Sequence, residues 1–439
     1  MNRQIAGLAA SLALGAAFVS LTATAGAAVT RTLQKSINVP SGDSVTVENL
    51  VGHMHVTQGN GPLQVTATVV AGGDHAQALL QSVKLDVSTT GGQVKVHVDY
   101  PVDRYDTFLY VPADAKSNGS DEVCFLGHLI CFHGRSSSSF RYQGRGVRVN
   151  RSTGGGAGAP LYVDVDVRVP ARLSASFSNA AGLLDADGLA DNLGLVTKGG
   201  DIHAQDLKGS LDVGSGGGDV YLGDVASSDA KVHTGGGDAK LENVSDKLSL
   251  GSGGGDVTGT NLRGDLSVST GGGDARLEGL SGKLSVHSGG GDARLSGDLS
   301  ALQTLSAGTG GGDLTVSGNL SALRSVDADT GGGELTLSGN LTALTSLQAG
   351  TGGGDLHVTG DLAALASLDA ESGGGGIVLR ATHLSMHLDA ASSGGGISVH
   401  LPGLRNVSSS SDHFSCDIGN AAGKARLRSG GGDITVVQM

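Results

Sequence analysis

A repeated five-residue phrase constrains this chain more than any other feature: a serine or threonine, three glycines and an aspartate. Copies of the phrase end at Asp219, Asp238, Asp256, Asp274, Asp292, Asp313 and Asp355. A glutamate version ends at Glu334, a shorter one at Asp201 and a final copy at Asp433. Counted in residues, the period is 18 or 19 from Asp201 to Asp292 and 21 from there to Ile397. A fixed period of this length indicates a chain built from stacked structural repeats.

Within each repeat, apolar residues alternate with polar ones. Ala275 and Leu277 follow one aspartate, and Leu284 and Val286 precede the next glycine triplet. Alternation with period two is typical of β-strands, so each repeat should contain two short strands separated by glycine-rich corners. A short strand pair cannot bury its apolar face alone, whereas stacked repeats can. We therefore predict an all-β fold in which residues 161–439 form a parallel β-solenoid (β-helix) of about 13 coils, with 18- and then 21-residue repeats.

The end of the predicted solenoid is less regular than its middle. The gap from Ile397 to Asp433 corresponds in length to two further coils of the shorter, 18-residue kind. The phrase Asn-Ala-Ala-Gly occurs at 179–182 and again at 420–423, near the two ends of the repeat region. Atypical terminal units are expected of solenoids, because an end coil must protect an otherwise unpaired strand edge.

The glycine triplets and the aspartates together predict a tight corner. Glycine adopts positive φ without strain, so left-handed backbone is expected at the triplets. The aspartate is expected to cap its turn by accepting hydrogen bonds from turn amides. Stacking in register also brings like charges to about 5 Å, where each pair repels by about 0.8 kcal/mol in water. Bound cations, calcium in the first place, are the alternative means of offsetting this repulsion, and the candidate ligands are Asp219, Asp238, Asp256, Asp274, Asp292 and Asp313.

Residues 28–112 are expected to form a small β-rich capping region with one short helix. Alternating patterns predict strands at 44–49, 53–58 and 63–71. Apolar residues at helical spacing predict a helix from Asp74 to Ser82, with Asp74 as its N-cap.

Residues 113–160 interrupt the pattern and are predicted to be an insertion loop rich in Cys, Arg, Ser and Gly. Cys124 and Cys131 are close enough in sequence to form a disulfide in an oxidising compartment. Together with His128 and His133 they also match the spacing of a zinc site, and a pair of unmodified thiols is the third alternative.

The same insertion carries a set of arginines on an otherwise acidic chain: Arg135, Arg141, Arg145, Arg148 and Arg151. One interpretation is a solvated basic insertion. The other is a contact for an anionic surface or glycan, or for the chain's own aspartates.

The N-terminus is typical of an export signal. Arg3 precedes an apolar segment at 5–21, and small residues between Ala25 and Ala28 offer a cleavage site, so residues 1–27 are predicted to be removed. No later apolar stretch is long enough to cross a bilayer, and we expect no membrane span. The predicted destination is the periplasm, the cell surface or the medium. The formal net charge of −13 makes nucleic acid an unfavourable partner.

Three sequence segments carry a family resemblance. They are Ser-Val-Thr-Val-Glu-Asn-Leu-Val-Gly-His-Met-His-Val at 44–56, Val-Arg-Val-Pro-Ala at 167–171 and Leu-Asp-Val-Gly-Ser-Gly-Gly-Gly-Asp-Val at 211–220. The chain resembles the "putative adhesin" domain family of bacterial β-solenoid proteins, whose function is largely unassigned. The resemblance implies a β-solenoid and a role in surface contact, and it implies no catalytic residues. The insertion at 113–160 and the regular 21-residue repeats depart from the family pattern.

Motifs for catalysis are missing from the sequence. Gly-x-Ser-x-Gly, the Walker phosphate loop and His-Glu-x-x-His do not occur. His53 and His55 share one strand face and are either ordinary surface histidines or a metal pair. We predict a non-enzymatic, adhesin-like protein that binds a protein or a cell-envelope polymer. The alternatives are a self-assembling structural protein of the envelope and a polysaccharide-active β-helix enzyme.

Overall fold

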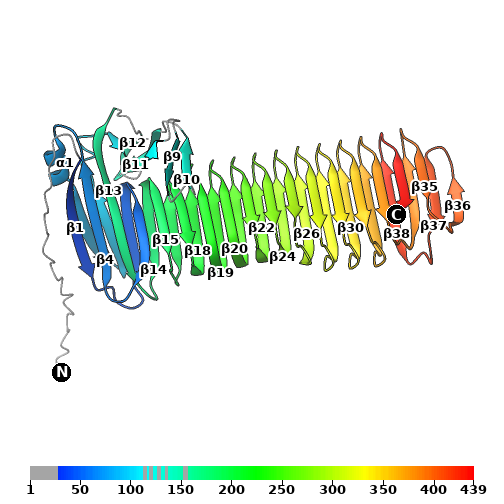
Figure 1. Ribbon diagram of the computed structural model, residues 1–439, viewed down its shortest axis with the longest axis horizontal. Helices are drawn as coiled ribbons and strands as arrows, with labels where there is room; N and C mark the ends of the chain where they lie inside the picture. The colour runs from blue at the N-terminus through cyan, green and yellow to red at the C-terminus, as the bar shows by residue number, and fades with distance from the viewer. Residues whose placement is uncertain (1–27, 112–115, 118–121, 126–129, 134–136, 152–156) are drawn as a thin grey trace, which may run out of the picture. The chain divides into compact units, whose positions relative to one another are not determined.

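The computed structural model describes residues 28–111, 116–117, 122–125, 130–133, 137–151 and 157–439 (Figure 1). Helix α1 (Ala76–Ser82) is the single helix among these residues, and most of the rest is β-strand. The predicted all-β class is therefore confirmed. The chain divides into two compact units, Met1–Ala204 and Gln205–Met439, which are described separately below as unit 1 and unit 2.

Unit 1 contains α1 and the first strands, the last of which, β17, ends one residue beyond the unit. They are β1 (Val29–Ile37), β2 (Ser44–Val51), β3 (Met54–Gly59), β4 (Leu63–Ala71), β5 (Lys84–Thr90), β6 (Gln93–Asp99), β7 (Thr107–Tyr110), β8 (Lys116–Ser117), β9 (Glu122–Phe125), β10 (Ile130–His133), β11 (Ser137–Tyr142), β12 (Arg145–Arg151), β13 (Ala159–Pro170), β14 (Ser174–Ala181), β15 (Leu183–Asp187), β16 (Leu193–Thr197) and β17 (Asp201–Gln205).

The N-terminal strands pair in register with strands that lie much later in the sequence. Strand β2 pairs in parallel with β14, with Asn49 opposite Asn179, and β3 pairs in parallel with β15. The side-chain amide of Asn49 donates to the side-chain oxygen of Asn179 at 3.0 Å, and both residues are buried. The sequence suggested that the N-terminal region is a separate cap. The structure instead shows its strands taking part in the repeated pairing, because β2 and β14 share one alternation of buried residues.

The short helix is present, but its N-cap differs from the prediction. The N-cap residue is His75 rather than Asp74, and no side chain caps the helix. The helix is held instead by burial of Leu79 and Leu80 and by Arg31, whose Nη1 donates to the Leu80 carbonyl at 3.0 Å. Tertiary packing thus supplies the stability that a side-chain cap gives an isolated helix.

The segment predicted as a loop contains strands. Strands β11 and β12 form an antiparallel hairpin, and β12 also pairs in parallel with β7. Val147 and Val149 alternate with exposed residues and are buried, and the Tyr142 hydroxyl donates to the Val98 carbonyl at 2.7 Å. This alternation, short and interrupted by polar residues, explains why a hairpin forms where composition favoured a loop.

Unit 2 contains only strands and their connections. The strands are β18 (Lys208–Ser215), β19 (Val220–Thr234), β20 (Ala239–Ser252), β21 (Val257–Thr260), β22 (Arg263–Thr270), β23 (Ala275–Glu278), β24 (Ser281–Ser288), β25 (Ala293–Ser296), β26 (Ala301–Thr309), β27 (Leu314–Gly318), β28 (Ser325–Thr330), β29 (Leu335–Gly339), β30 (Ser346–Thr351), β31 (Leu356–Gly360), β32 (Ser367–Ser372), β33 (Ile377–Ala381), β34 (Met386–Ser392), β35 (Ile397–His400), β36 (Arg405–Ser409), β37 (His413–Asp417), β38 (Gly423–Ser429) and β39 (Ile434–Gln438).

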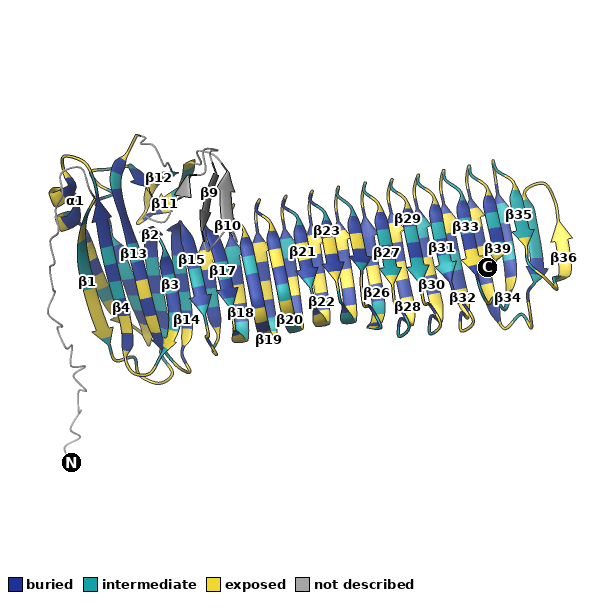
Figure 2. Ribbon diagram, in the orientation of Figure 1, coloured by how far each residue is buried: buried dark blue, intermediate teal, exposed yellow. Residues whose placement is uncertain are grey.

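Equivalent strands of successive repeats in unit 2 pair in parallel. Val257 lies opposite its equivalent Ala275 in the next repeat, and Leu314 lies opposite its equivalent Leu335. Buried and exposed residues alternate along these strands, so the buried ones form columns across the sheet (Figure 2). Such a pattern is consistent with a solenoid, since each repeat buries its apolar face only against its neighbours.

The C-terminal strands do not follow one another in space. Strand β38 pairs in parallel with both β32 and β34, and β39 pairs in parallel with both β33 and β35. The last strands of the chain therefore lie between strands that precede them, and Figure 1 shows the red β38 among orange strands. Strands β36 and β37 pair antiparallel and precede this return. The segment from Ile397 to Asp433 thus does not form two successive coils, which corrects the prediction.

Candidate functional site

The repeated carboxylates of unit 2 form a ladder of hydrogen bonds, which we call the acidic ladder. Oδ1 of Asp219 accepts from the backbone amide of Asp238 at 2.8 Å, and Oδ1 of Asp238 accepts from the amide of Asp256 at 2.8 Å. The same bond, at 2.8 to 2.9 Å, links the following members Asp256, Asp274, Asp292, Asp313 and Glu334. The sequence predicted amide hydrogen bonds within each turn. The structure places them between neighbouring corners, because the corners stack at the strand spacing.

Two features of the structure offset the repulsion along the acidic ladder. The amide hydrogen bonds place a partially positive hydrogen against a carboxylate oxygen of the neighbouring corner. Arg276 lies beside two members, with Nη2 at 2.6 Å from Asp274 and Nη1 at 3.5 Å from Asp256. At Asp219 burial raises the pKa above its usual value, the bond from the Asp238 amide opposes this, and the Asp238 charge adds to it. Cation binding by the ladder stays a prediction.

The glycine triplets are needed for close approach of neighbouring corners. A Cβ on Gly253 would lie 2.2 Å from the Gly235 carbonyl oxygen, and one on Gly255 would lie 2.1 Å from that of Gly237. None of Gly253, Gly254 and Gly255 has a φ in the left-handed range. The expectation of positive φ at the triplets was therefore wrong, and steric contact between corners is the reason for glycine.

A column of buried hydroxyls accompanies the acidic ladder and was not predicted. Thr234 Oγ1 donates to the Gly218 carbonyl at 3.1 Å and accepts from the Gly237 amide at 3.1 Å. The equivalent residues are Ser215, Ser252, Thr270, Ser288, Thr309, Thr330, Thr351 and Ser372, all buried. The signal was present in the sequence, because a serine or threonine precedes each triplet.

The exposed face of the longer strands presents a second column of hydroxyls, which we call the serine column. Ser249, Ser267, Ser285 and Ser306 lie opposite one another on β20, β22, β24 and β26, and all are exposed. They lie in a shallow groove of about 680 Å³. Lys231 and Asp265 also line this groove, so charged groups of both signs lie beside the serines.

Four of the five arginines of the predicted contact lie among the described residues, all in unit 1. Arg141, Arg145 and Arg148 are exposed on the β11–β12 hairpin. Arg151 is less exposed, and its Nη2 donates to the Gly199 carbonyl at 3.0 Å. Arg135 lies outside the described residues. The hairpin thus offers three of the predicted arginines to solvent, while Arg151 contacts the protein's own backbone.

Two segments of the chain, residues 164–280 and 260–437, match the family Toastrack DUF4097, a domain of unknown function. Together they span more than half of the sequence. The chain belongs to the Toastrack family. No curated protein matches it.

Several solved structures are similar to this Toastrack protein. A "putative adhesin" from Parabacteroides merdae is 10% identical with a TM-score of 0.28, covering 75% of this chain and 96% of its own. A "putative lipid binding protein" from Parabacteroides distasonis is 10% identical with a TM-score of 0.24, covering 77% and 95%. A "putative cell adhesion protein" from Clostridium sporogenes is 8% identical with a TM-score of 0.15, covering 93% and 100%. Likeness at this level supports no inference about function.

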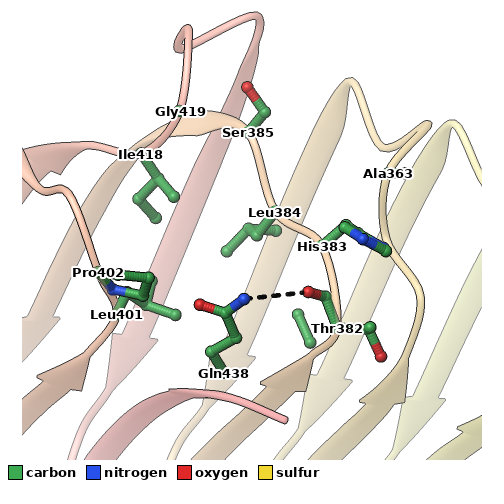
Figure 3. Close-up of a pocket in the computed structure, with 11 residues that line it drawn as sticks. Ala363, Thr382, His383, Leu384, Ser385, Leu401, Pro402, Ile418, Gly419 and Gln438 are labelled. Carbon is green, nitrogen blue, oxygen red and sulfur yellow. Dashed lines mark hydrogen bonds between the residues drawn. The ribbon is translucent and has the colours of Figure 1, made fainter.

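The C-terminal part of the Toastrack chain contains a pocket that sequence reasoning missed. It has a volume of about 360 Å³ and lies where the chain leaves the regular repeat (Figure 3). Leu384, Leu401 and Ile418 contribute apolar surface, and Gln438 Nε2 donates to the Thr382 carbonyl at 3.4 Å. The irregular spacing of the repeats after Ile397 was the sequence feature that could have indicated this pocket.

The cysteines of this Toastrack protein divide into two groups. Cys416 is buried and free, and burial raises the pKa of its thiol. Cys124 lies directly opposite Cys131 in the antiparallel pair of β9 and β10. Their side chains lie outside the described residues, as do His128 and the side chain of His133, so the disulfide and the zinc site stay predictions. Among the described residues, no helix has the length and apolar character needed to cross a membrane.

Proposed function

We propose that this Toastrack protein is exported and acts without catalysis, as an adhesin-like β-solenoid of about 13 coils that binds a polymer of the cell envelope or a protein on its surface. The observation that supports this proposal is the serine column, in which Ser249, Ser267, Ser285 and Ser306 repeat in register on an exposed face. Strand pairing spaces such side chains at about 4.8 Å.

A regular row of hydroxyls suits a partner that is itself regular. Each hydroxyl can both donate and accept a hydrogen bond, and each bond contributes only about 1 kcal/mol in water. Several such bonds made at once by one polymer chain add through the high effective concentration of linked groups. The extended groove with Lys231 and Asp265 at its side permits contacts to charged substituents as well.

The arrangement suits binding better than turnover. Catalysis requires unlike polar groups that converge on one reacting atom. The serine column instead repeats one group along a line, as expected when a surface contacts many equivalent units of a partner.

Binding of the mature chain to cell-envelope polysaccharide, peptidoglycan and whole cells tests the proposal by co-sedimentation. Ser267→Arg and Ser285→Arg each place a long charged side chain in the groove and should weaken binding at least about fivefold, since about 1 kcal/mol per lost bond is a factor of five. Thr258→Arg, at an exposed position on β21, is the matched control and should bind normally.

Other outcomes contradict the proposal. No binding to any of these materials, or equal loss in the control, would remove the serine column as the binding surface. Release of sugar fragments would favour the enzyme alternative. Concentration-dependent oligomers in light scattering, without binding, would favour self-assembly.

A further inference from the structure

Two imidazoles and a carboxylate from distant parts of the sequence meet on one face of unit 1. Strands β3 and β15 pair in parallel with His55 opposite Asp185. His53 lies two residues before His55 and therefore on the same face, and the two rings are 6.1 Å apart between centroids. One ligand atom from each of His53, His55 and Asp185 lies within 4.8 Å of the others.

The distances within this group are close to those of a metal centre. Nδ1 of His55 lies 2.9 Å from Oδ2 of Asp185. Two ligands of a tetrahedral zinc ion, each about 2.1 Å from the metal, lie about 3.4 Å from each other. A cation between His55 and Asp185 therefore requires only a small opening, and His53 supplies a third ligand atom within 4.8 Å of one from each of these two residues.

A third histidine holds the carboxylate in place. His203, on the neighbouring strand β17, has its Nδ1 3.0 Å from Oδ1 of Asp185. The side chains of His203 and Asp185 are 14% and 15% exposed, whereas that of His55 is 39% exposed. One carboxylate oxygen is thus engaged on the buried side and the other faces His55. Hydrogen bonds of this kind orient metal ligands and raise their affinity.

The backbone that carries His53 is fixed by its neighbours. Gly52 has a φ of +137°, and a Cβ there would lie 2.1 Å from the Val163 carbonyl oxygen. The His53 amide donates to Oδ1 of Asp164 at 2.8 Å. The buried amide of Asn179 donates to the Gly52 carbonyl at 2.7 Å. The turn is therefore held in one conformation before any ligand arrives, which reduces the entropic cost of binding.

This grouping lies in the irregular first repeats. Asp185, His203 and Tyr221 follow one another at equal intervals, and the equivalent residues of the next regular repeats are Lys240, Thr258 and Arg276. Ordinary repeats thus place a mixture of side chains at this position, and the imidazole–carboxylate cluster occurs where the repeat departs from its consensus.

We propose that His53, His55 and Asp185 bind one divalent transition-metal ion of the zinc class, with His203 as a positioning residue for Asp185. Two imidazole nitrogens and one carboxylate oxygen are ligands that Zn²⁺ and its neighbours in the first row prefer, while Ca²⁺ prefers oxygen alone. Three protein ligands leave a coordination position for water or for a donor from a partner.

Titration with Zn²⁺ alone tests the proposal. The mature full-length protein is made without a polyhistidine tag, stripped with chelator and studied by isothermal titration calorimetry and elemental analysis. We expect one tightly bound Zn²⁺ per chain, and Ca²⁺ in excess should not displace it. Cobalt in place of zinc should give visible d–d absorption bands typical of nitrogen and oxygen ligands. Side chains that only hydrogen-bond to one another, without binding a metal, would not produce this signal.

Substitutions distinguish the metal ligands from residues that do not bind the metal. His55→Gln and Asp185→Asn should each lower zinc affinity at least tenfold, and His203→Gln should lower it about tenfold as a second-sphere change. The matched control is His383→Gln, because His383 also lies 3.1 Å from a carboxylate, Asp361, but without a second imidazole. Circular dichroism of the metal-free variants checks folding, and His55→Gln suffices if Asp185→Asn is unstable.

Three results would overturn the assignment. The first is absence of stoichiometric zinc binding. The second is binding that His55→Gln and Asp185→Asn leave unchanged. The third is loss of zinc in Cys124→Ser together with its retention in Asp185→Asn, which would place the metal at the cysteine pair.

Discussion

At the scale of single residues, the close packing of the corners in unit 2 depends on where a Cβ would project from each glycine. A Cβ added at the first or third glycine of a regular triplet would lie against a carbonyl oxygen of the preceding corner. A Cβ added at the middle glycine would meet no such close contact. Only two positions of each regular triplet therefore require glycine for steric reasons. The middle position is free to vary as far as contacts are concerned.

A pair of adjacent substitutions tests this difference. Gly253→Ala places a Cβ 2.2 Å from the Gly235 carbonyl oxygen and should lower the melting temperature, with a cost of about 1–3 kcal/mol as found for overpacked sites. Gly254→Ala meets nothing within 4 Å and should leave the melting temperature unchanged or slightly raised. Thermal unfolding by circular dichroism compares the two variants. Equal destabilisation by both would contradict the steric explanation.

At the scale of elements, the order of the C-terminal strands has a consequence for stability. Strand β38 separates β32 from β34, and β39 separates β33 from β35. Strands β34 and β35 therefore pair mainly with strands that come later in the sequence. Nearest-neighbour coupling of this kind makes the terminal repeats one cooperative group.

Truncation of one buried side chain should reveal that group. Leu427 is fully buried in β38, and Leu427→Ala should lower the free energy of local unfolding by about 2–5 kcal/mol. Hydrogen exchange should then accelerate in β34, β35, β38 and β39, while β22 to β26 keep their protection. Arg428→Ala, at the exposed neighbouring position, is the control and should change little. Acceleration spread evenly over unit 2 would show that the terminal strands are not a separate group.

At the scale of the whole molecule, the chain combines an acidic surface with few aromatic residues and a predicted export signal. The formal net charge is −13 and aromatic residues make up 3% of the chain. Aliphatic residues, mainly leucine and valine, fill the buried columns. Export to an oxidising compartment would also bring the Cys124–Cys131 pair under conditions where disulfides persist.

Intact-mass measurement of the exported protein tests both expectations together. We expect removal of residues 1–27, with cleavage between Ala25 and Ala28, and a mass lower by two hydrogens for a Cys124–Cys131 disulfide. Alkylation under native conditions should spare Cys416, which is fully buried, and modify it after unfolding. Labelling of Cys124 and Cys131 without reductant would contradict the disulfide, and an uncut N-terminus would contradict export by this signal.

The sequence alone determined the class of fold and most of the local structure. Alternation of apolar residues, as in Leu284 and Val286, predicts strands because side chains of a strand point to opposite faces in turn. The fixed period predicts which residues of successive repeats lie side by side, and the pairing of Val257 with Ala275 and of Leu314 with Leu335 agrees. These are short-range or periodic signals, and they are visible without knowledge of the fold.

The tertiary structure alone decided which groups meet across long sequence separations. His55 and Asp185 lie far apart in the chain and become neighbours only because β3 pairs with β15. The direction of the ladder hydrogen bonds and the position of β38 between β32 and β34 likewise depend on which corner or strand lies next in space. Periodicity is equally compatible with successive and with inserted repeats, since both bury the same columns, so packing of the assembled chain makes the choice.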